Sequence, residues 1–135
     1  SEDYYSCSNK GVLRGMHFQT PPNDLAKLVY CAQGKAFDAV VDLRRNSVTF
    51  GKYTTLELDS KKANMIYIPP GLAHGFYTVS ERAIMIYKVS KMYSPECDAG
   101  ILWNSIGIPW PDEDPIISER DKKFIKFDRF YSPFI

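Results

Sequence analysis

One short stretch of this 135-residue chain combines the two side chains best suited to acid–base chemistry on an anionic ligand. In residues 12–19, VLRGMHFQ, Arg14 comes shortly before His17, with Gly15 between them. Histidine titrates near neutrality and suits proton transfer, whereas arginine binds phosphate or carboxylate groups in a fixed geometry. The stretch therefore predicts a site that holds an anion while a proton moves. On its own, such a histidine is more often a hydrogen-bonded structural residue.

The remaining residue types narrow the chemistry. His17 and His74 are the two histidines, no HxH pair occurs, and cupin-type metal sites use two or three histidines with a carboxylate. We therefore expect no metal and no other cofactor. No serine or cysteine lies in a nucleophile motif, and no glycine-rich phosphate loop is present. Acid–base chemistry remains, with His17, the tyrosines and orienting carboxylates as its candidates.

Charge and cysteine usage exclude several classes of protein. Lys and Arg number 17 against 16 Asp and Glu, so the net charge is +1, without the basic stripe that a nucleic-acid or membrane surface needs. The three cysteines, Cys7, Cys31 and Cys97, are too widely spaced for a zinc site, and we expect buried or half-buried thiols in a reducing compartment. With neither a membrane-spanning run nor a signal-peptide pattern, the cytoplasm is the expected location.

The elements that must position these residues are strands, because apolar residues recur with period two. Between residues 36 and 43, Phe37, Ala39 and Val41 share one face, and Asp38 and Val40 take the other. Short turn-forming segments separate the runs. We predict strands over residues 12–18, 27–32, 36–43, 52–58, 64–68, 73–79 and 82–88. Six or seven short strands indicate one all-β domain over residues 1–135, an antiparallel sandwich or barrel.

The chain after residue 95 loses this alternation. Its prolines and tryptophans predict a long irregular segment, and Ser118 is placed to cap a short helix with Asp121 as a weaker capping-box partner. The aromatic tail, residues 124–135, is expected to pack on the barrel or on a neighbouring subunit. Strict alternation would put Arg14 and His17 on opposite faces, so a bulge or other irregularity is expected near Gly15.

Taken together, these patterns resemble the dTDP-4-dehydrorhamnose 3,5-epimerase family, in order and with almost unchanged spacing between about Val12 and Asp121. The resemblance implies a cupin jelly roll without metal, usually a homodimer, that acts on a nucleotide-linked sugar, most simply a dTDP-sugar. It is carried by the segments VLRGMHFQ (12–19), KLV (27–29), FDAVVDLR (37–44), TFG (49–51), IPPGLAHGF (68–76), YK (87–88), YSP (93–95), ILWN (101–104), IGIPWP (106–111) and SERD (118–121).

The resemblance also implies a role for each matching residue. His17 lies at the position of the general base, Asp121 at that of the carboxylate that orients it, Tyr87 at that of the proton donor, and Lys27 beside the keto oxygen of the sugar. Substrate-binding positions are matched by Arg14, the His74–Asp38 pair, Tyr93 as the residue that stacks on the base, and Asp98 and Arg120, which stand where close relatives carry Glu and Lys.

These residue types suit epimerisation beside a ketone. A 4-keto group acidifies the C–H bonds on carbons 3 and 5, so a base on one face can remove a proton while a cation stabilises the enolate. An acid on the other face then returns a proton and inverts the centre. The implied activity is 3,5-epimerisation of a dTDP-4-keto-6-deoxyhexose, in the synthesis of L-rhamnose and surface polysaccharides.

Two departures leave alternatives open. Relatives in this family carry a further N-terminal segment, which we expect to be missing here, and where they read Gln-Asp-Asn-His-Ser this chain has Glu2, Asp3, Tyr4, Tyr5 and Ser6. The changes at Glu2 and Tyr4 replace residues that help hold the nucleotide, so the identity of the nucleotide stays open. The sequence also does not separate epimerisation at carbon 3, at carbon 5 or at both. A single-centre epimerase on another nucleotide sugar is one alternative. A catalytically weak nucleotide-sugar-binding subunit is another, and a metal-dependent cupin dioxygenase is the remotest.

Overall fold

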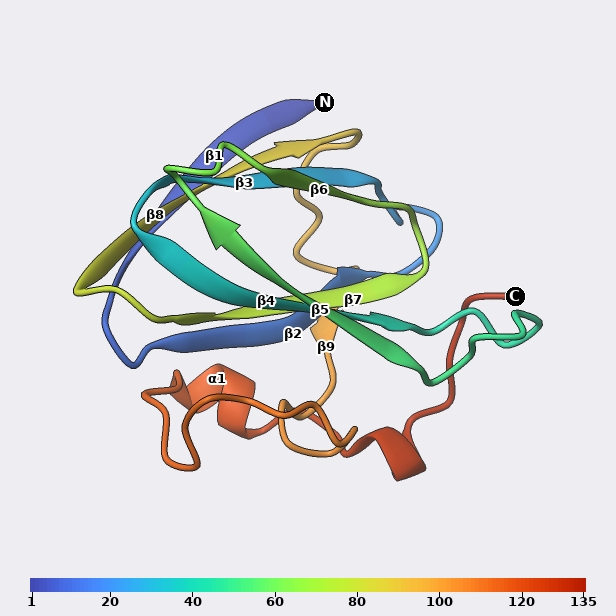
Figure 1. The fold of residues 1–135 in the computed structure, drawn as a ribbon. Coiled ribbons are helices and arrows are strands. Elements are labelled where there is room, and N and C mark those ends of the chain that lie inside the picture. Colours follow the sequence, from blue (N-terminus) through green and yellow to red (C-terminus); the bar gives the residue numbers. More distant parts are fainter.

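Two antiparallel sheets packed face to face form the body of the molecule in the computed structural model, which describes residues 1–135. One sheet has four strands in the order β1-β8-β3-β6, and the other has five in the order β5-β4-β7-β2-β9 (Figure 1). Their bounds are β1 Glu2–Asn9, β2 Leu13–Gln19, β3 Lys27–Gln33, β4 Lys35–Asp42, β5 Tyr53–Asp59, β6 Met65–Ile68, β7 Leu72–Thr78, β8 Arg82–Val89 and β9 Asp98–Gly100.

All seven strands predicted from alternation are present, with each end within one residue of the expected position. The expected total of six or seven was nevertheless too low, because β1 and β9 were missed. β1 lacks an apolar period, since its inward positions Tyr4, Ser6 and Ser8 are polar or amphipathic. It is a strand because all its residues pair with β8, which is a tertiary cause that no local pattern records.

β4 is buried on both faces, and the predicted division of its residues between the faces is confirmed. Ala36 and Val40 join the core between the two sheets, with Phe76 and Met85 among its largest members. The opposite face of β4 contributes to a second core under the five-stranded sheet. That core buries Ala39, Val41 and Leu43, and Phe37 packs half-buried against it.

The C-terminal segment makes the second core possible, because it covers the outer face of the five-stranded sheet (Figure 1). It contains the helix α1, Glu119–Lys122, and one 3₁₀ turn, η1, Phe127–Arg129. Phe134 is buried against Phe18, and Phe130 contacts the same ring edge-on. The prediction that the aromatic tail packs on the barrel is thus confirmed, and no helix is long and apolar enough to cross a membrane.

The cysteines follow the expectation only in part. Cys31 is buried and Cys97 half-buried, but Cys7 is exposed, and none of them forms a disulfide. The prediction was wrong for Cys7 because alternation along β1 turns Ser6 and Ser8 inward and Cys7 outward.

The irregularity expected near Gly15 is confirmed. The register between β2 and β7 shifts between Arg14 and His17, and Gly15 has a φ of +145°. A Cβ on Gly15 would lie 2.7 Å from the Cα of Gly75 on β7, so only glycine fits this close approach of two strands. The shift allows Arg14 and His17 to face the same side of the sheet.

Candidate active site

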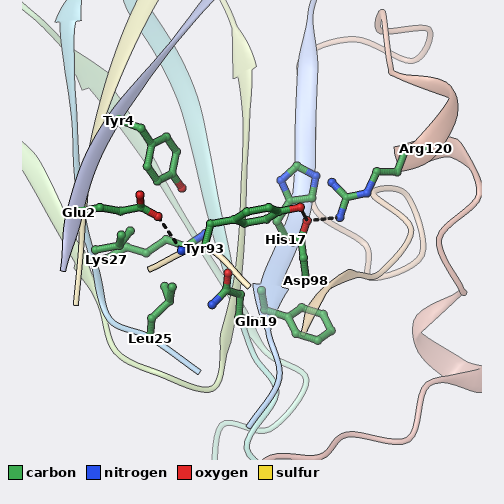
Figure 2. A pocket seen from close by; sticks show the side chains of 11 residues that line it. Glu2, Tyr4, His17, Gln19, Leu25, Lys27, Tyr93, Asp98 and Arg120 are labelled. Carbon is green, nitrogen blue, oxygen red and sulfur yellow. Dashed lines mark hydrogen bonds and ion pairs between the residues drawn. The ribbon is translucent and has the colours of Figure 1, made fainter. Parts of the chain in front are cut away.

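A cavity opens between the two sheets and consists of two adjoining chambers. The outer chamber has a volume of about 360 Å³ and the inner one about 220 Å³, and both are lined by Tyr4, His17 and Lys27. Arg14, His74 and Tyr87 complete the polar wall of the inner chamber. The outer chamber is bordered by Tyr93, Asp98 and Arg120 and also by Glu2 and Gln19, as Figure 2 shows.

His17 and Asp121 form a hydrogen-bonded couple at the inner chamber. The distance from His17 Nε2 to Asp121 Oδ1 is 2.9 Å, and the backbone N–H of Gly15 donates to Oδ2 at 3.1 Å. Although burial raises the pKa of Asp121, the hydrogen bond and charge of His17 and the Gly15 N–H outweigh it and leave that pKa below its ordinary value. An Nε2–H that donates to Asp121 leaves Nδ1 as the proton acceptor.

Asp121 reaches His17 because of the short helix α1. Ser118 caps this helix as predicted, since its side chain accepts a hydrogen bond from the backbone N–H of Asp121. The second half of a capping box is absent, because the Asp121 carboxylate turns to β2 instead. β9 pairs with β2 only at His17, Phe18 and Gln19. The helix α1, which carries Asp121, contacts β2 as well.

Tyr87 enters the inner chamber from the opposite sheet. It lies on β8 with its hydroxyl 3.1 Å from Ser6 Oγ, and its side chain is almost fully buried. Its ring stacks on Tyr4 with 4.6 Å between centroids and meets His74 edge-on at 6.3 Å. Burial raises the pKa of Tyr87, so the phenol is protonated at neutral pH.

Lys27 is a half-buried cation of the cavity. It lies on β3 at the junction of the two chambers. Burial lowers the pKa of its ammonium group to about 8, an effect that the charges of Asp98 and Asp38 partly oppose. A cation with little solvent around it interacts strongly with any negative charge that develops nearby.

The second histidine pair lies deeper. His74 Nε2 is 2.7 Å from Asp38 Oδ2, and Asp38 has no exposed surface. Burial raises the pKa of Asp38 despite the opposing influence of His74 and Lys27. Asp38 was predicted among the substrate-binding residues; its position behind His74 makes it a support for that ring. The side chain of Arg14 is fixed by Ser8, whose hydroxyl accepts a hydrogen bond from Arg14 Nε at 2.8 Å.

The rim of the outer chamber carries the remaining predicted residues. Arg120 donates to Asp98 at 2.6 Å, and the Tyr93 hydroxyl donates to the same carboxylate at 3.3 Å (Figure 2). The backbone N–H of Tyr93 donates to Glu2 at 2.6 Å. The Tyr93 ring is 60% exposed and is available to a flat ligand. Every predicted site residue except the two buried carboxylates, Asp38 and Asp121, thus borders the cavity.

Ser6, Ser8 and Gln19 were not predicted as site residues, and Tyr4 was predicted only as a replacement for a residue that helps hold the nucleotide. Ser6 and Ser8 were missed together with β1, because their polar side chains give no apolar alternation. Gln19 holds the Tyr93 loop, because its side-chain oxygen accepts from the Ser94 N–H at 2.9 Å. No group of three or more His, Cys, Asp or Glu side chains has the arrangement of a metal site.

This architecture defines a class of protein. It is a two-sheet jelly roll of the cupin type, in which a histidine of one sheet is hydrogen-bonded to a carboxylate of α1, and a buried tyrosine of the other sheet borders the same chamber. An acid–base epimerase requires such an arrangement. The profile of the dTDP-4-dehydrorhamnose 3,5-epimerase family matches residues 1–129. The chain belongs to this family.

Individual relatives agree with this assignment. The dTDP-4-dehydrorhamnose 3,5-epimerase of Shigella flexneri is 42% identical over 134 residues, covering 96% of this chain and 74% of that protein. The crystal structure of dTDP-6-deoxy-D-glucose-3,5-epimerase from Legionella pneumophila in complex with dTDP-4-keto-L-rhamnose superposes with a TM-score of 0.95 at 34% identity, covering 100% of this chain and 74% of that one.

A relative with a narrower reaction also matches. The 3'-monoepimerase of Streptomyces bikiniensis, crystallised with dTDP-quinovose, has a TM-score of 0.88 at 30% identity and covers 93% of this chain and 65% of that one. The shared fold therefore accommodates epimerases that differ in the number of centres they invert.

Proposed function

We propose that this chain is a dTDP-4-dehydrorhamnose 3,5-epimerase that inverts carbons 3 and 5 of dTDP-4-keto-6-deoxyglucose, on the route to dTDP-L-rhamnose and surface polysaccharides. One observation carries the proposal: His17, which is hydrogen-bonded to Asp121, and Tyr87 border one chamber from opposite sheets. Inversion requires a proton to leave one face of a carbon and return to the other, and this placement provides a group on each face.

The steps follow from the residues. His17 Nδ1 removes the proton beside the ketone, and Asp121 stabilises the imidazolium ion that forms. The electrons of the broken C–H bond move onto the keto oxygen, where Lys27 neutralises the enolate. As the enolate electrons return and the ketone re-forms, Tyr87 donates its proton to the opposite face of the same carbon. Proton exchange with solvent then reprotonates the Tyr87 phenolate and deprotonates the His17 imidazolium ion. The reaction changes no oxidation state and needs no redox cofactor.

The outer chamber suits the nucleotide half of the substrate. It adjoins the inner chamber at His17 and Lys27, so a sugar in the inner chamber would leave its diphosphate and base outside. The exposed ring of Tyr93 offers a stacking surface, and Arg120 offers a cation for phosphate oxygens. Arg14 offers a second cation from the inner chamber.

Epimerisation at one carbon is the second candidate, supported by the likeness to the Streptomyces bikiniensis 3'-monoepimerase. Solvent deuterium incorporation into dTDP-4-keto-6-deoxyglucose, followed by NMR for the wild type and His17→Gln, separates the two. Label at both carbons that depends on His17 supports the 3,5-epimerase, and label at one carbon supports the monoepimerase. Binding of the nucleotide sugar without exchange contradicts both and supports a binding subunit.

We further propose a homodimer in the cytoplasm. The outward face of the four-stranded sheet carries an apolar row across all four strands, in which Tyr5 pairs with Ile86, Ile86 with Tyr30, and Tyr30 with Met65. Such a face is typical of a twofold interface between copies of one chain. Three cysteines without a disulfide suit a reducing compartment.

A further inference from the structure

Tyr4 lies on β1 at the junction of the two chambers, next to Tyr87, the proposed proton donor. It borders both chambers, and the antiparallel register of β1 and β8 places it directly opposite Tyr87. Figure 2 shows the Tyr4 hydroxyl directed into the cavity above Tyr93. The proposed mechanism gives Tyr4 no task.

The contact between the two rings is specific. Their centroids are 4.6 Å apart and their planes differ by 14°, which is a stacked pair held by cross-strand pairing. Tyr4 is 44% exposed, whereas Tyr87 is 6% exposed. Tyr4 therefore covers the solvent side of Tyr87 without being part of the core itself.

β1 fixes Tyr87 at two points. Ser6, two residues beyond Tyr4 on the same face of the strand, holds the Tyr87 hydroxyl at 3.1 Å, and Tyr4 holds the plane of the ring. Core side chains and the edge of His74 pack on other parts of the Tyr87 ring, and Tyr4 adds a stacked contact on its solvent side. Ser6 and Tyr4 are thus the contacts through which β1 restrains the Tyr87 phenol.

We propose that Tyr4 is a positioning residue, which aligns Tyr87 with the face of the substrate opposite His17 and so favours inversion over return of the proton by His17. The proposal rests on the proposed function. The enolate has two fates: His17 can return a proton to the original face, giving solvent exchange with retention, or Tyr87 can protonate the other face. A misaligned Tyr87 shifts the balance towards exchange without inversion.

The test measures this balance. In D₂O, with dTDP-4-keto-6-deoxyglucose as substrate, we expect Tyr4→Ala and Tyr4→Leu to raise the ratio of exchange with retention to inversion by about two- to tenfold, the factor that corresponds to one aromatic stack. Tyr4→Phe keeps the ring and should restore the wild-type ratio. Tyr53→Ala is the matched control, since Tyr53 is a strand tyrosine of similar exposure, 41%, that borders neither chamber.

A residue that only lines the cavity would behave differently: Tyr4→Ala would raise KM and leave the ratio unchanged, and that result overturns the inference. NMR of the free chain labelled at tyrosine supplies a readout that needs no turnover, with the Tyr87 signals assigned by their loss in Tyr87→Phe. They should shift in Tyr4→Ala and Tyr4→Leu, through loss of the ring current of Tyr4, but not in Tyr4→Phe.

The two readouts separate the two proposals. A wild-type chain without exchange or inversion contradicts the proposed function, and the NMR spectra then decide on Tyr4 by themselves. Unchanged Tyr87 signals in Tyr4→Ala overturn the inference, even where the wild-type chain is an active epimerase.

Discussion

At the scale of single residues, Asp121 shows how one short side chain joins a helix to a strand and a base. Its backbone N–H completes the cap of α1, and its two carboxylate oxygens accept from Gly15 and His17. Both oxygens are engaged, so the carboxylate has one orientation. The predicted capping-box contact of the Asp121 side chain is therefore absent, because both carboxylate oxygens are engaged on β2.

Asp121→Asn should therefore lower kcat by about 10- to 100-fold, a loss typical of a group that orients a functional histidine. An amide accepts hydrogen bonds through only one of its two ends, so either Gly15 or His17 faces an N–H group in place of an acceptor. Steady-state kinetics measure the effect. Asp128→Asn, an exposed acid in η1, is the control, and equal kinetics of the two variants would contradict the orienting role.

The lowered pKa of Lys27 predicts that activity falls at alkaline pH. Its pKa of about 8 means that the ammonium ion is lost as the pH rises through 8, and the neutral amine cannot neutralise the enolate. We expect kcat/KM, which reports the pKa values of the free enzyme, to fall on the alkaline side with a midpoint near 8. A rate that stays constant up to pH 10 would show that Lys27 does not act as the cation.

The charged Lys27 side chain is also expected to lower the free energy of unfolding. Because the ordinary pKa of 10.5 is lowered by burial, the folded chain binds fewer protons than the unfolded one between pH 8 and 10.5, and stability rises with pH in that window. Below pH 8 the full cost is present. Lys27→Met should raise the free energy of unfolding at pH 7 by on the order of 2 kcal/mol.

Urea denaturation at pH 7 and pH 10 checks this prediction, with the advantage of Lys27→Met shrinking at the higher pH. Lys62→Met, an exposed lysine paired with Glu57, should show no such gain. A variant that loses both activity and stability at pH 7 would indicate that Lys27 contributes mainly through packing.

At the scale of elements, the bend of β2 decides which side chains reach the cavity. Gly15→Ala would bring a Cβ to 2.7 Å from Gly75 Cα and 3.2 Å from the carbonyl of His74, in a backbone conformation that favours glycine. We expect a loss of about 2 to 4 kcal/mol in the free energy of unfolding. Activity should fall further than stability explains, because Arg14 and His17 lose their common face.

Gly107→Ala is a matched control for this prediction. Gly107 also has a positive φ, +88°, but a Cβ there meets nothing within 4 Å. It should cost only about 1 to 2 kcal/mol, the penalty of the conformation itself. Thermal denaturation of the two variants separates the clash from the backbone preference, and equal losses would show that the close approach to β7 is unimportant.

At the scale of the whole molecule, the two sheets differ in what covers their outer faces. The five-stranded sheet is covered on its outside by the C-terminal segment (Figure 1). The four-stranded sheet exposes side chains of its apolar row. Tyr5 is 71% exposed and Met65 54%. The chain itself thus covers the outer face of the five-stranded sheet, whereas the outer face of the four-stranded sheet is a surface that a second copy can cover.

The expected oligomer follows from that surface. Light scattering coupled to size-exclusion chromatography should give twice the mass of one chain, and Ile86→Lys, in the centre of the row, should give monomers. Val48→Lys is the control, because Val48 is 94% exposed in the turn after β4 and lies off the row. A monomeric wild type would contradict the dimer.

The sequence by itself determined a great deal of this protein. Alternation located seven strands, Ser118 located a helix, and the ordered motifs led to the family, because strand periodicity, capping and motif spacing are local properties of the chain. It also required a break near Gly15, since Arg14 and His17 cannot share a face of a regular strand.

Tertiary structure alone decided the rest. β1 is a strand only because β8 pairs with it, and Tyr4 and Ser6 belong to the site only because that pairing sets them against Tyr87. Likewise, the buried position of Asp38 and the lowered pKa of Lys27 depend on how deeply the two sheets enclose them. Pairing partners and solvent exclusion arise from residues far apart in the chain, so no local pattern contains them.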